Sequence, residues 1–136
     1  MGSGSGAYVD GFILPVGDGK GEAYREMATN ASAVFLEYGA VRVVEAFGDD
    51  VPDGKVTDYR RAVKQEQGEQ VVFSFIEWPD KDTRNKGWSK VMEDPRMRPD
   101  AETMPFDPKR MFWGGFEMLV DSKAGLGLHA AEREVA

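Results

Sequence analysis

The strongest constraint on the fold is a run of helical periodicity that lies between two strand-like runs near the start of the chain. Between residues 20 and 38, apolar residues recur at steps of three and four: Tyr24, Met27, Ala28, Ala31, Val34, Phe35 and Tyr38. These steps place them on one face of a helix. Gly39 follows at the position where many helices end in a left-handed residue. The sequence therefore predicts a helix over residues 20–38.

Four strand-like runs and a second helix complete the pattern. The runs rich in β-branched and aromatic residues, which favour strands, are residues 7–14, 41–47, 70–78 and 111–120. Pro15 closes the first run, and Asp80 is a suitable N-cap for a helix that ends before Pro95. The order β-α-β-β-α-β predicts a ferredoxin-like α+β fold, an antiparallel sheet with two helices on one face.

The second face of this sheet needs a cover of its own. Several predicted strands are apolar on both sides, but the two helices can cover only one face. An exposed apolar face of that size usually marks an interface. The economical arrangement is a two-fold homodimer in which two sheets pack face to face, a dimeric α+β barrel.

The length of 136 residues suits one domain, since domains commonly run to about 100–200 residues. We expect that domain to span residues 7–121. The Gly/Ser-rich residues 1–6 have the composition of an expression scar or linker. Residues 122–136 lack strand character and are interpreted as a C-terminal tail.

Composition excludes several classes of function. The formal net charge is −7, and no Lys/Arg cluster offers a basic face, so we expect no nucleic-acid partner. The chain has no cysteine and one histidine, His129, so we expect no metal site and no bound cofactor. The apolar runs are too short to cross a membrane, and no secretory leader is evident. The expected location is the cytoplasm.

Two carboxylates, Asp10 and Glu45, lie within strands whose neighbours are mostly apolar. If they face inward, burial would raise their pKa values and allow them to act as acid or base. They are the candidate catalytic residues. The alternative is that each points to an open edge or pairs with a nearby arginine such as Arg42.

The second helix carries a stripe that is a candidate ligand-binding surface. Arg84, Gly87, Trp88 and Met92 share its predicted sheet-facing side. The missing side chain at Gly87 would leave a gap, Trp88 would form its wall, and Arg84 would hold a carboxylate or enolate at its mouth. The alternative is ordinary packing, with Arg84 extending to solvent.

Arg110 lies just before the last strand, in a segment rich in proline. It is a candidate to anchor that segment to a carboxylate such as Asp94 or Asp107. The other possibility is direct contact with a ligand.

Several segments resemble the YbaA-like family of bacterial proteins, whose domain has no established function. The resemblance rests on residues 8–12, 71–75, 90–96 and above all 104–116, and it covers roughly residues 7–121. It implies a dimeric α+β barrel, in agreement with the predicted strand order. Folds of this kind host cofactor-free oxygenases, isomerases, haem-degrading enzymes and binding proteins, so the fold alone does not choose a reaction.

Two functional hypotheses remain open. The first is a cofactor-free enzyme, an oxygenase, isomerase or similar, that acts on a small apolar or anionic compound. The second is a non-catalytic, stress-associated dimer that binds a small molecule. A cavity with converging polar groups would favour the enzyme, whereas a filled core beneath the second helix would favour the binding protein.

Overall fold

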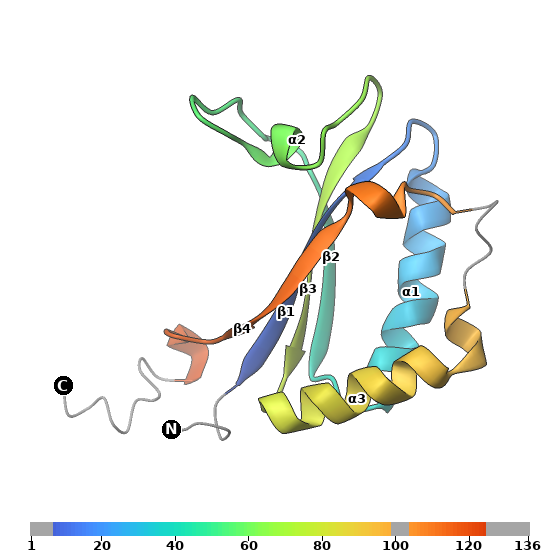
Figure 1. Ribbon diagram of the computed structural model, residues 1–136, viewed down its shortest axis with the longest axis vertical. Helices are drawn as coiled ribbons and strands as arrows, with labels where there is room; N and C mark the ends of the chain where they lie inside the picture. The colour runs from blue at the N-terminus through green and yellow to red at the C-terminus, as the bar shows by residue number, and fades with distance from the viewer. Residues whose placement is uncertain (1–6, 99–103, 125–136) are drawn as a thin grey trace.

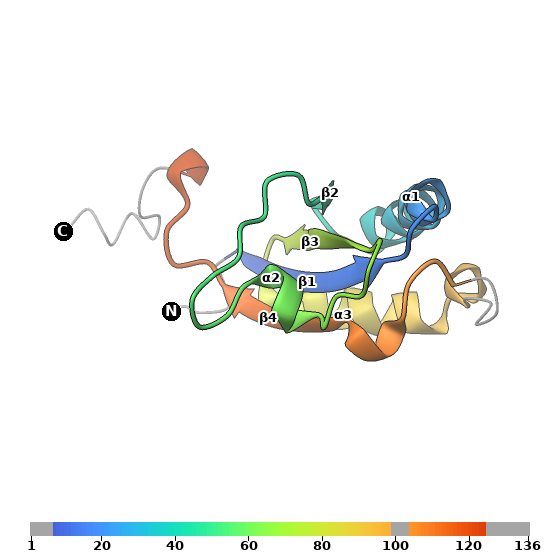
Figure 2. The ribbon, with the colours of Figure 1, turned by 90° about the horizontal axis from the view of Figure 1, so that it is seen from above.

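The computed structural model describes residues 7–98 and 104–124, which build one four-stranded antiparallel sheet. The strands are β1 (Tyr8–Val16), β2 (Arg42–Phe47), β3 (Gln70–Trp78) and β4 (Phe112–Glu117). Their order across the sheet is β2-β3-β1-β4, and every neighbouring pair is antiparallel. Seen from above, β2 and β4 are the two edge strands (Figure 2). The predicted ferredoxin-like topology is confirmed.

Two long helices lie on one side of the sheet (Figure 1). The first, α1 (Gly21–Glu37), runs alongside the strands, and α3 (Lys81–Glu93) crosses one end of the sheet. A third helix, α2 (Tyr59–Ala62), is a single turn in the segment between β2 and β3, on the side away from α1. No helix within the described ranges is long and apolar enough to span a membrane.

The helix ends follow the local chemistry of the sequence. Asp80 caps α3, since its carboxylate accepts a hydrogen bond of 2.7 Å from the backbone N–H of Thr83. After α1, Gly39 has a φ of +113°, a conformation that glycine adopts at little cost. A side chain at Gly39 would also collide with Thr83, at 2.8 Å from its Cγ2. Both predicted helix ends are confirmed to within a residue or two.

Two strand boundaries differ from the prediction. β1 continues through Pro15 to Val16, although Pro15 was expected to close it. β4 pairs with β1 only as far as Ile13, and beyond it a single bridge joins Val16 to Phe106, so Pro15 lies outside the ladder between β1 and β4. Proline is tolerated at such an edge position. β4 itself ends at Glu117, opposite the first residue of β1, because no strand remains to pair with.

The strand register sorts side chains between the two faces, because alternate residues of a strand point to opposite sides. The core residues of β1 that pack beneath the helices are Tyr8, Leu14 and Val16, and those of β3 are Val72, Ile76 and Trp78. They meet Val34 and Phe35 of α1 and Val91 of α3. The apolar stripe predicted for the first helix therefore does face the core.

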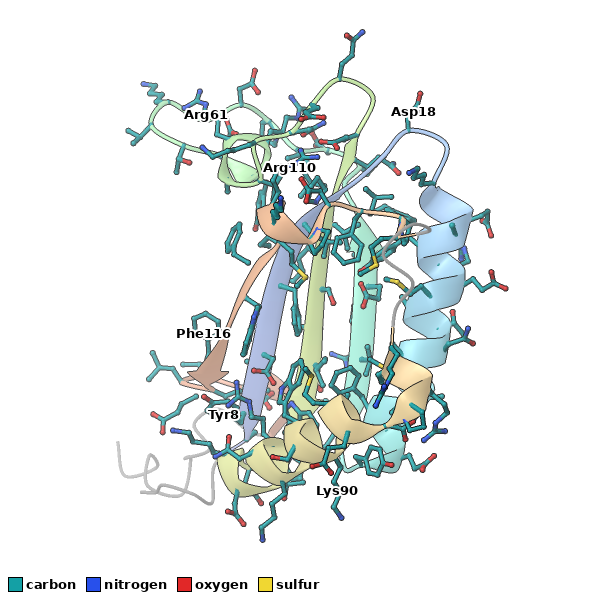
Figure 3. All side chains as sticks on the ribbon, turned by 45° about the vertical axis from the view of Figure 1, so that its right-hand side comes forward. Tyr8, Asp18, Arg61, Lys90, Arg110 and Phe116 are labelled. Atoms are coloured by element: carbon teal, nitrogen blue, oxygen red, sulfur yellow. The ribbon has the colours of Figure 1, made fainter. Side chains whose placement is uncertain are left out.

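The opposite face of the sheet remains open and aromatic. Phe73, Phe112 and Phe116 are 44%, 46% and 58% exposed there, and Figure 3 shows Phe116 on β4. The ring of Phe116 lies over the glycine pair Gly11–Gly114, which face each other across β1 and β4. This face holds a shallow hollow of about 510 Å³. The predicted second apolar face is present.

The predicted terminal segments are largely outside the described residues. This applies to residues 1–6 and to 125–136, which include His129. Ser122–Ala124 form a short 3-10 turn after β4.

Candidate functional site

Two adjoining cavities lie between α1 and the helix-covered face of the sheet. One cavity, which reaches the core residues Leu14 and Val91, has a volume of about 220 Å³ and is called the inner cavity. The other, which reaches Arg25 and Thr29, has a volume of about 320 Å³ and is called the outer cavity. They share the lining residues Tyr24, Ala28, Ser32, Val43 and Glu45. The two cavities together are called the cleft below, and their shared residues lie where the two cavities adjoin.

The wall of the inner cavity is mostly apolar. Its aromatic and sulfur-containing residues include Phe12, Phe35, Trp88, Phe106, Met27 and Met111. Met92 also reaches this cavity, but it is 71% exposed and lies at the margin of α3. An apolar lining with a few polar groups is typical of small-molecule sites.

Glu45 is the acidic residue of this cleft. It lies on β2 opposite Ser74 of β3, and its Oε1 accepts a hydrogen bond of 2.6 Å from the hydroxyl of Tyr24 on α1. Partial burial of the carboxylate raises the pKa of Glu45 above its ordinary value, while hydrogen bonds from Tyr24 and Ser74 oppose that rise. Because β2 is an edge strand, Glu45 stays accessible from the outer cavity.

Tyr24 is held in its protonated form. Burial and the neighbouring Glu45 carboxylate both raise the pKa of Tyr24 well above its usual range. The hydroxyl is therefore a permanent hydrogen-bond donor that orients Glu45. The sequence pattern placed Tyr24 only in an apolar stripe and gave Ser74 no role. A tyrosine on a core-facing stripe was the available signal, since a buried tyrosine hydroxyl usually has a partner.

Asp10 lies in a different environment. It is 0% exposed, and its Oδ1 accepts a 2.6 Å bond from Nη2 of Arg84 on α3. Its Oδ2 accepts bonds of 2.9 and 2.8 Å from the indole N–H groups of Trp78 and Trp88. Every donor is directed at one carboxylate, so Asp10 ties α3 to the middle of the sheet.

The guanidinium of Arg84 is enclosed by aromatic rings and by a glycine. It lies 5.1 Å from the ring centroid of Tyr8 and 5.9 Å from that of Trp113. A side chain at Gly115 would lie 2.8 Å from Arg84 Nη2 and 2.5 Å from the hydroxyl of Tyr8. The absence of a side chain at Gly115 permits this close approach, and the pairing of β4 with β1 is continuous through that residue.

The expectation of a gap at Gly87 is wrong. A Cβ at this position would lie 2.5 Å from Cζ3 of Trp78 and 2.8 Å from the backbone oxygen of Tyr38. The ring of Trp78 already fills the space where the gap was expected. Trp88, one residue further, does line the inner cavity, and it stacks on Trp113 at 5.5 Å between ring centroids.

Asp10 and Glu45 share the helix-covered face but do not meet. β3 lies between their strands, and the register places Glu45 level with Ser74 and Phe12. Asp10 lies two residues before Phe12 on β1, opposite Ile76. Arg42, the expected alternative partner, instead bonds Glu77 at 3.1 Å.

Arg110 joins the segment before β4 to the segment before β3. It bonds Asp107 at 3.1 Å and holds Glu69 with two bonds of 2.7 and 2.6 Å. Figure 3 shows Arg110 beneath the loop that carries Arg61. Asp94, the other partner considered, accepts bonds from Arg96 and Tyr38 instead.

Metal ligation has no candidate in the part of the chain that the structure describes: nowhere in residues 7–98 and 104–124 do three or more His, Asp or Glu side chains form a group that could hold an ion.

Comparisons with known proteins agree with this fold. SnoaB from Streptomyces nogalater, described as a cofactor-independent oxygenase, superposes with a TM-score of 0.50 at 15% identity, covering 81% of this chain and 90% of that one. A conserved protein of unknown function from Bacteroides thetaiotaomicron gives 0.50 at 13% identity, with 85% and 100% covered. At these identities the likeness concerns the fold alone.

Sequence relatives identify the family. The chain is 56% identical over 114 residues to the uncharacterized protein YbaA of Escherichia coli. The matched region covers 84% of this chain and 97% of the relative. Residues 7–108 match the model of a family described as "Protein of unknown function (DUF1428)". The chain belongs to the DUF1428 family, to which the YbaA-like resemblance of its sequence pointed.

Proposed function

We propose that this protein binds a small apolar compound in the cleft between α1 and the sheet and removes a proton from it with Glu45. The observation that carries the proposal is the Glu45 carboxylate, which lines both cavities and accepts a hydrogen bond of 2.6 Å from Tyr24. Desolvation raises its pKa, although the residue keeps exposure to solvent on the edge strand β2. A raised pKa lies closer to neutral pH, and the carboxylate is then a stronger base. Perturbed carboxylates in clefts are typical of acid–base sites.

The remaining predicted site residues take supporting roles in this proposal. Arg84 and Arg110 are already bound to Asp10 and Glu69, so they hold the frame of the cleft rather than its ligand. Asp10 fixes the indole of Trp88, which forms part of the inner wall. A wall whose rotamers are fixed by neighbouring hydrogen bonds keeps a bound molecule in one orientation.

The likeness to SnoaB supports chemistry without a cofactor. A fold shared with a cofactor-independent oxygenase is an analogy and does not transfer a reaction. It is compatible with a mechanism in which the protein only takes a proton and the resulting carbanion reacts further, with oxygen or by isomerisation.

The test uses a probe that needs only a base. In 5-nitrobenzisoxazole, removal of the C3 proton breaks the N–O bond and yields a coloured cyanophenolate. We expect the protein to accelerate this reaction and Glu45→Gln to lower the rate at least about 10²-fold, the usual contribution of a positioned base. The control is Glu93→Gln, an exposed carboxylate at the end of α3 that lines neither cavity, which should retain the rate. Equal rates in the two variants, or no acceleration by the native protein, would refute the proposal.

The pH profile and the stability of Glu45→Gln follow from the direction of the pKa shift. The rate should rise with pH through the raised pKa of Glu45; Tyr24 and Arg25 are the other titratable residues that line the cleft, and Tyr24 keeps its proton. Above that pKa, Glu45 is ionised in the folded protein, and the charge is less favourable there than in the unfolded chain, so it lowers the stability of the fold. Since a glutamine oxygen can still accept the Tyr24 bond, urea unfolding at neutral pH should show unchanged or slightly higher stability.

We further propose that the protein is a homodimer joined through the open aromatic face. A contiguous apolar face favours association, and a two-fold axis lets the same face serve both copies. Light scattering should give about twice the chain mass of 15.1 kDa. Phe73→Lys should shift the mass towards one chain, whereas Leu36→Lys, at an equally exposed residue on α1, should not. A native monomer at micromolar concentration would contradict this arrangement.

A further inference from the structure

The charges that line the inner cavity are of one sign. Glu45 is its acidic residue, and neither lysine nor arginine occurs among the described residues that line it. Arg25 lines only the outer cavity, and its Nε bonds Glu22 at 3.2 Å. Glu45 is thus a carboxylate with hydrogen-bond donors from Tyr24 and Ser74 but without a cation of its own.

The surroundings of Glu45 suit a cation better than an anion. A carboxylate withdrawn from water is stabilised when a positive charge pairs with it. The faces of aromatic rings also attract cations, and Tyr24, Phe35, Trp88 and Phe106 all line the inner cavity. A ligand carboxylate, by contrast, would place a second negative charge beside Glu45, and the arginines that could offset it are bound elsewhere.

We propose that the ligand of this cleft is a lipophilic amine, bound as its ammonium ion with an N–H directed at Glu45. The apolar part of the molecule occupies the inner cavity, and the nitrogen lies beside Glu45, where the two cavities adjoin. This inference rests on the proposed function and narrows its substrate class. It replaces the anionic compound considered from the sequence, because that expectation depended on a free arginine in the site.

The test compares three probes that share one ring system and differ in charge. At pH 8, 1-naphthylmethylamine is a cation, 1-naphthalenemethanol is neutral and 1-naphthoate is an anion. Calorimetric titration of the native protein should give the tightest binding for the amine, about tenfold tighter than the alcohol, and the weakest for the carboxylate. In Glu45→Gln the amine and the alcohol should bind equally, while the alcohol keeps its native affinity. Glu93→Gln should retain the native order.

The pH dependence gives a second readout on the same probes. As the pH falls through the raised pKa of Glu45, the carboxylate takes up a proton and the affinity for the amine should fall. The affinity for the alcohol should stay constant over that range. The other titratable residues lining the cleft are Tyr24, which stays protonated, and Arg25, which pairs with Glu22.

The outcomes separate this inference from the proposed function. Equal or tighter binding of the alcohol or the carboxylate, an order that persists in Glu45→Gln, or no binding of any probe would overturn the amine site. If the benzisoxazole reaction still depends on Glu45, the proposed base survives that result. If the amine preference depends on Glu45 but no proton removal is found, the amine site stands and the proposed base falls.

Discussion

Replacing Asp10 with asparagine is expected to lower the free energy of unfolding by about 3–5 kcal/mol, the range found when one partner of a buried ion pair is removed. The Asp10 side chain is 0% exposed and that of Arg84 16% exposed. Asparagine would leave the guanidinium without its counter-charge and would turn an amide N–H towards donors that now bind the carboxylate. Since single domains are stable by about 5–15 kcal/mol, urea unfolding should show a large shift.

The matched control for this prediction is Asp82→Asn on the surface of α3. Asp82 pairs with Lys86 at 3.1 Å, and both side chains are about three-quarters exposed. Exposed pairs of this spacing contribute about 0.3–0.5 kcal/mol, so the same substitution should be nearly silent there. If Asp10→Asn and Asp82→Asn lower the stability equally, the Asp10 cluster does not hold α3 to the sheet.

Gly87→Ala is expected to destabilise the protein by about 1–3 kcal/mol, although alanine is the better helix former. In an exposed helix the exchange would gain about 1 kcal/mol. Here the new methyl group would lie 2.5 Å from the ring of Trp78, which is 1% exposed, and 2.8 Å from a backbone oxygen. Neither neighbour can move freely, so the overpacking outweighs the gain in helix propensity.

The control for this prediction is Gly21→Ala, at the first residue of α1. There an added Cβ would lie 3.7 Å from Cζ of Phe47, an ordinary contact. Thermal unfolding should show no loss for Gly21→Ala and a clear loss for Gly87→Ala. A Gly87→Ala variant that is as stable as the native protein would show that α3 and Trp78 are less tightly packed than the structure has them.

Much of the fold could be predicted because it follows from local periodicity and end signals. The spacing of Tyr24, Ala28 and Phe35 determines which side of α1 faces the core, and Asp80 and Gly39 determine where helices begin and end. The strand boundaries that differed from the prediction depend on the neighbouring strands. Whether Pro15 ends β1, and where β4 stops, is decided by which strand lies alongside.

The candidate site was predictable only in part. Asp10 and Glu45 are conspicuous in the sequence because carboxylates are rare among apolar strand residues. Their different surroundings are not visible there, since they depend on contacts between residues far apart in the chain. Arg84 is 74 residues from Asp10, and Tyr24 is 21 residues from Glu45. The sequence suggested that Arg84 binds a ligand, because it does not show that the guanidinium is already paired with Asp10.

The sequence by itself determined the order of elements, the apolar faces and the two carboxylates that deserve interest. The tertiary structure decided what each carboxylate does, because the protonation and reactivity of a carboxylate depend on the groups within a few ångströms of it. Packing of α3 against the sheet gives Asp10 an arginine and two indoles, whereas packing of α1 gives Glu45 one tyrosine and an open cavity. The same packing filled the expected gap at Gly87 with Trp78, since a glycine in a helix can equally leave space or admit a neighbour.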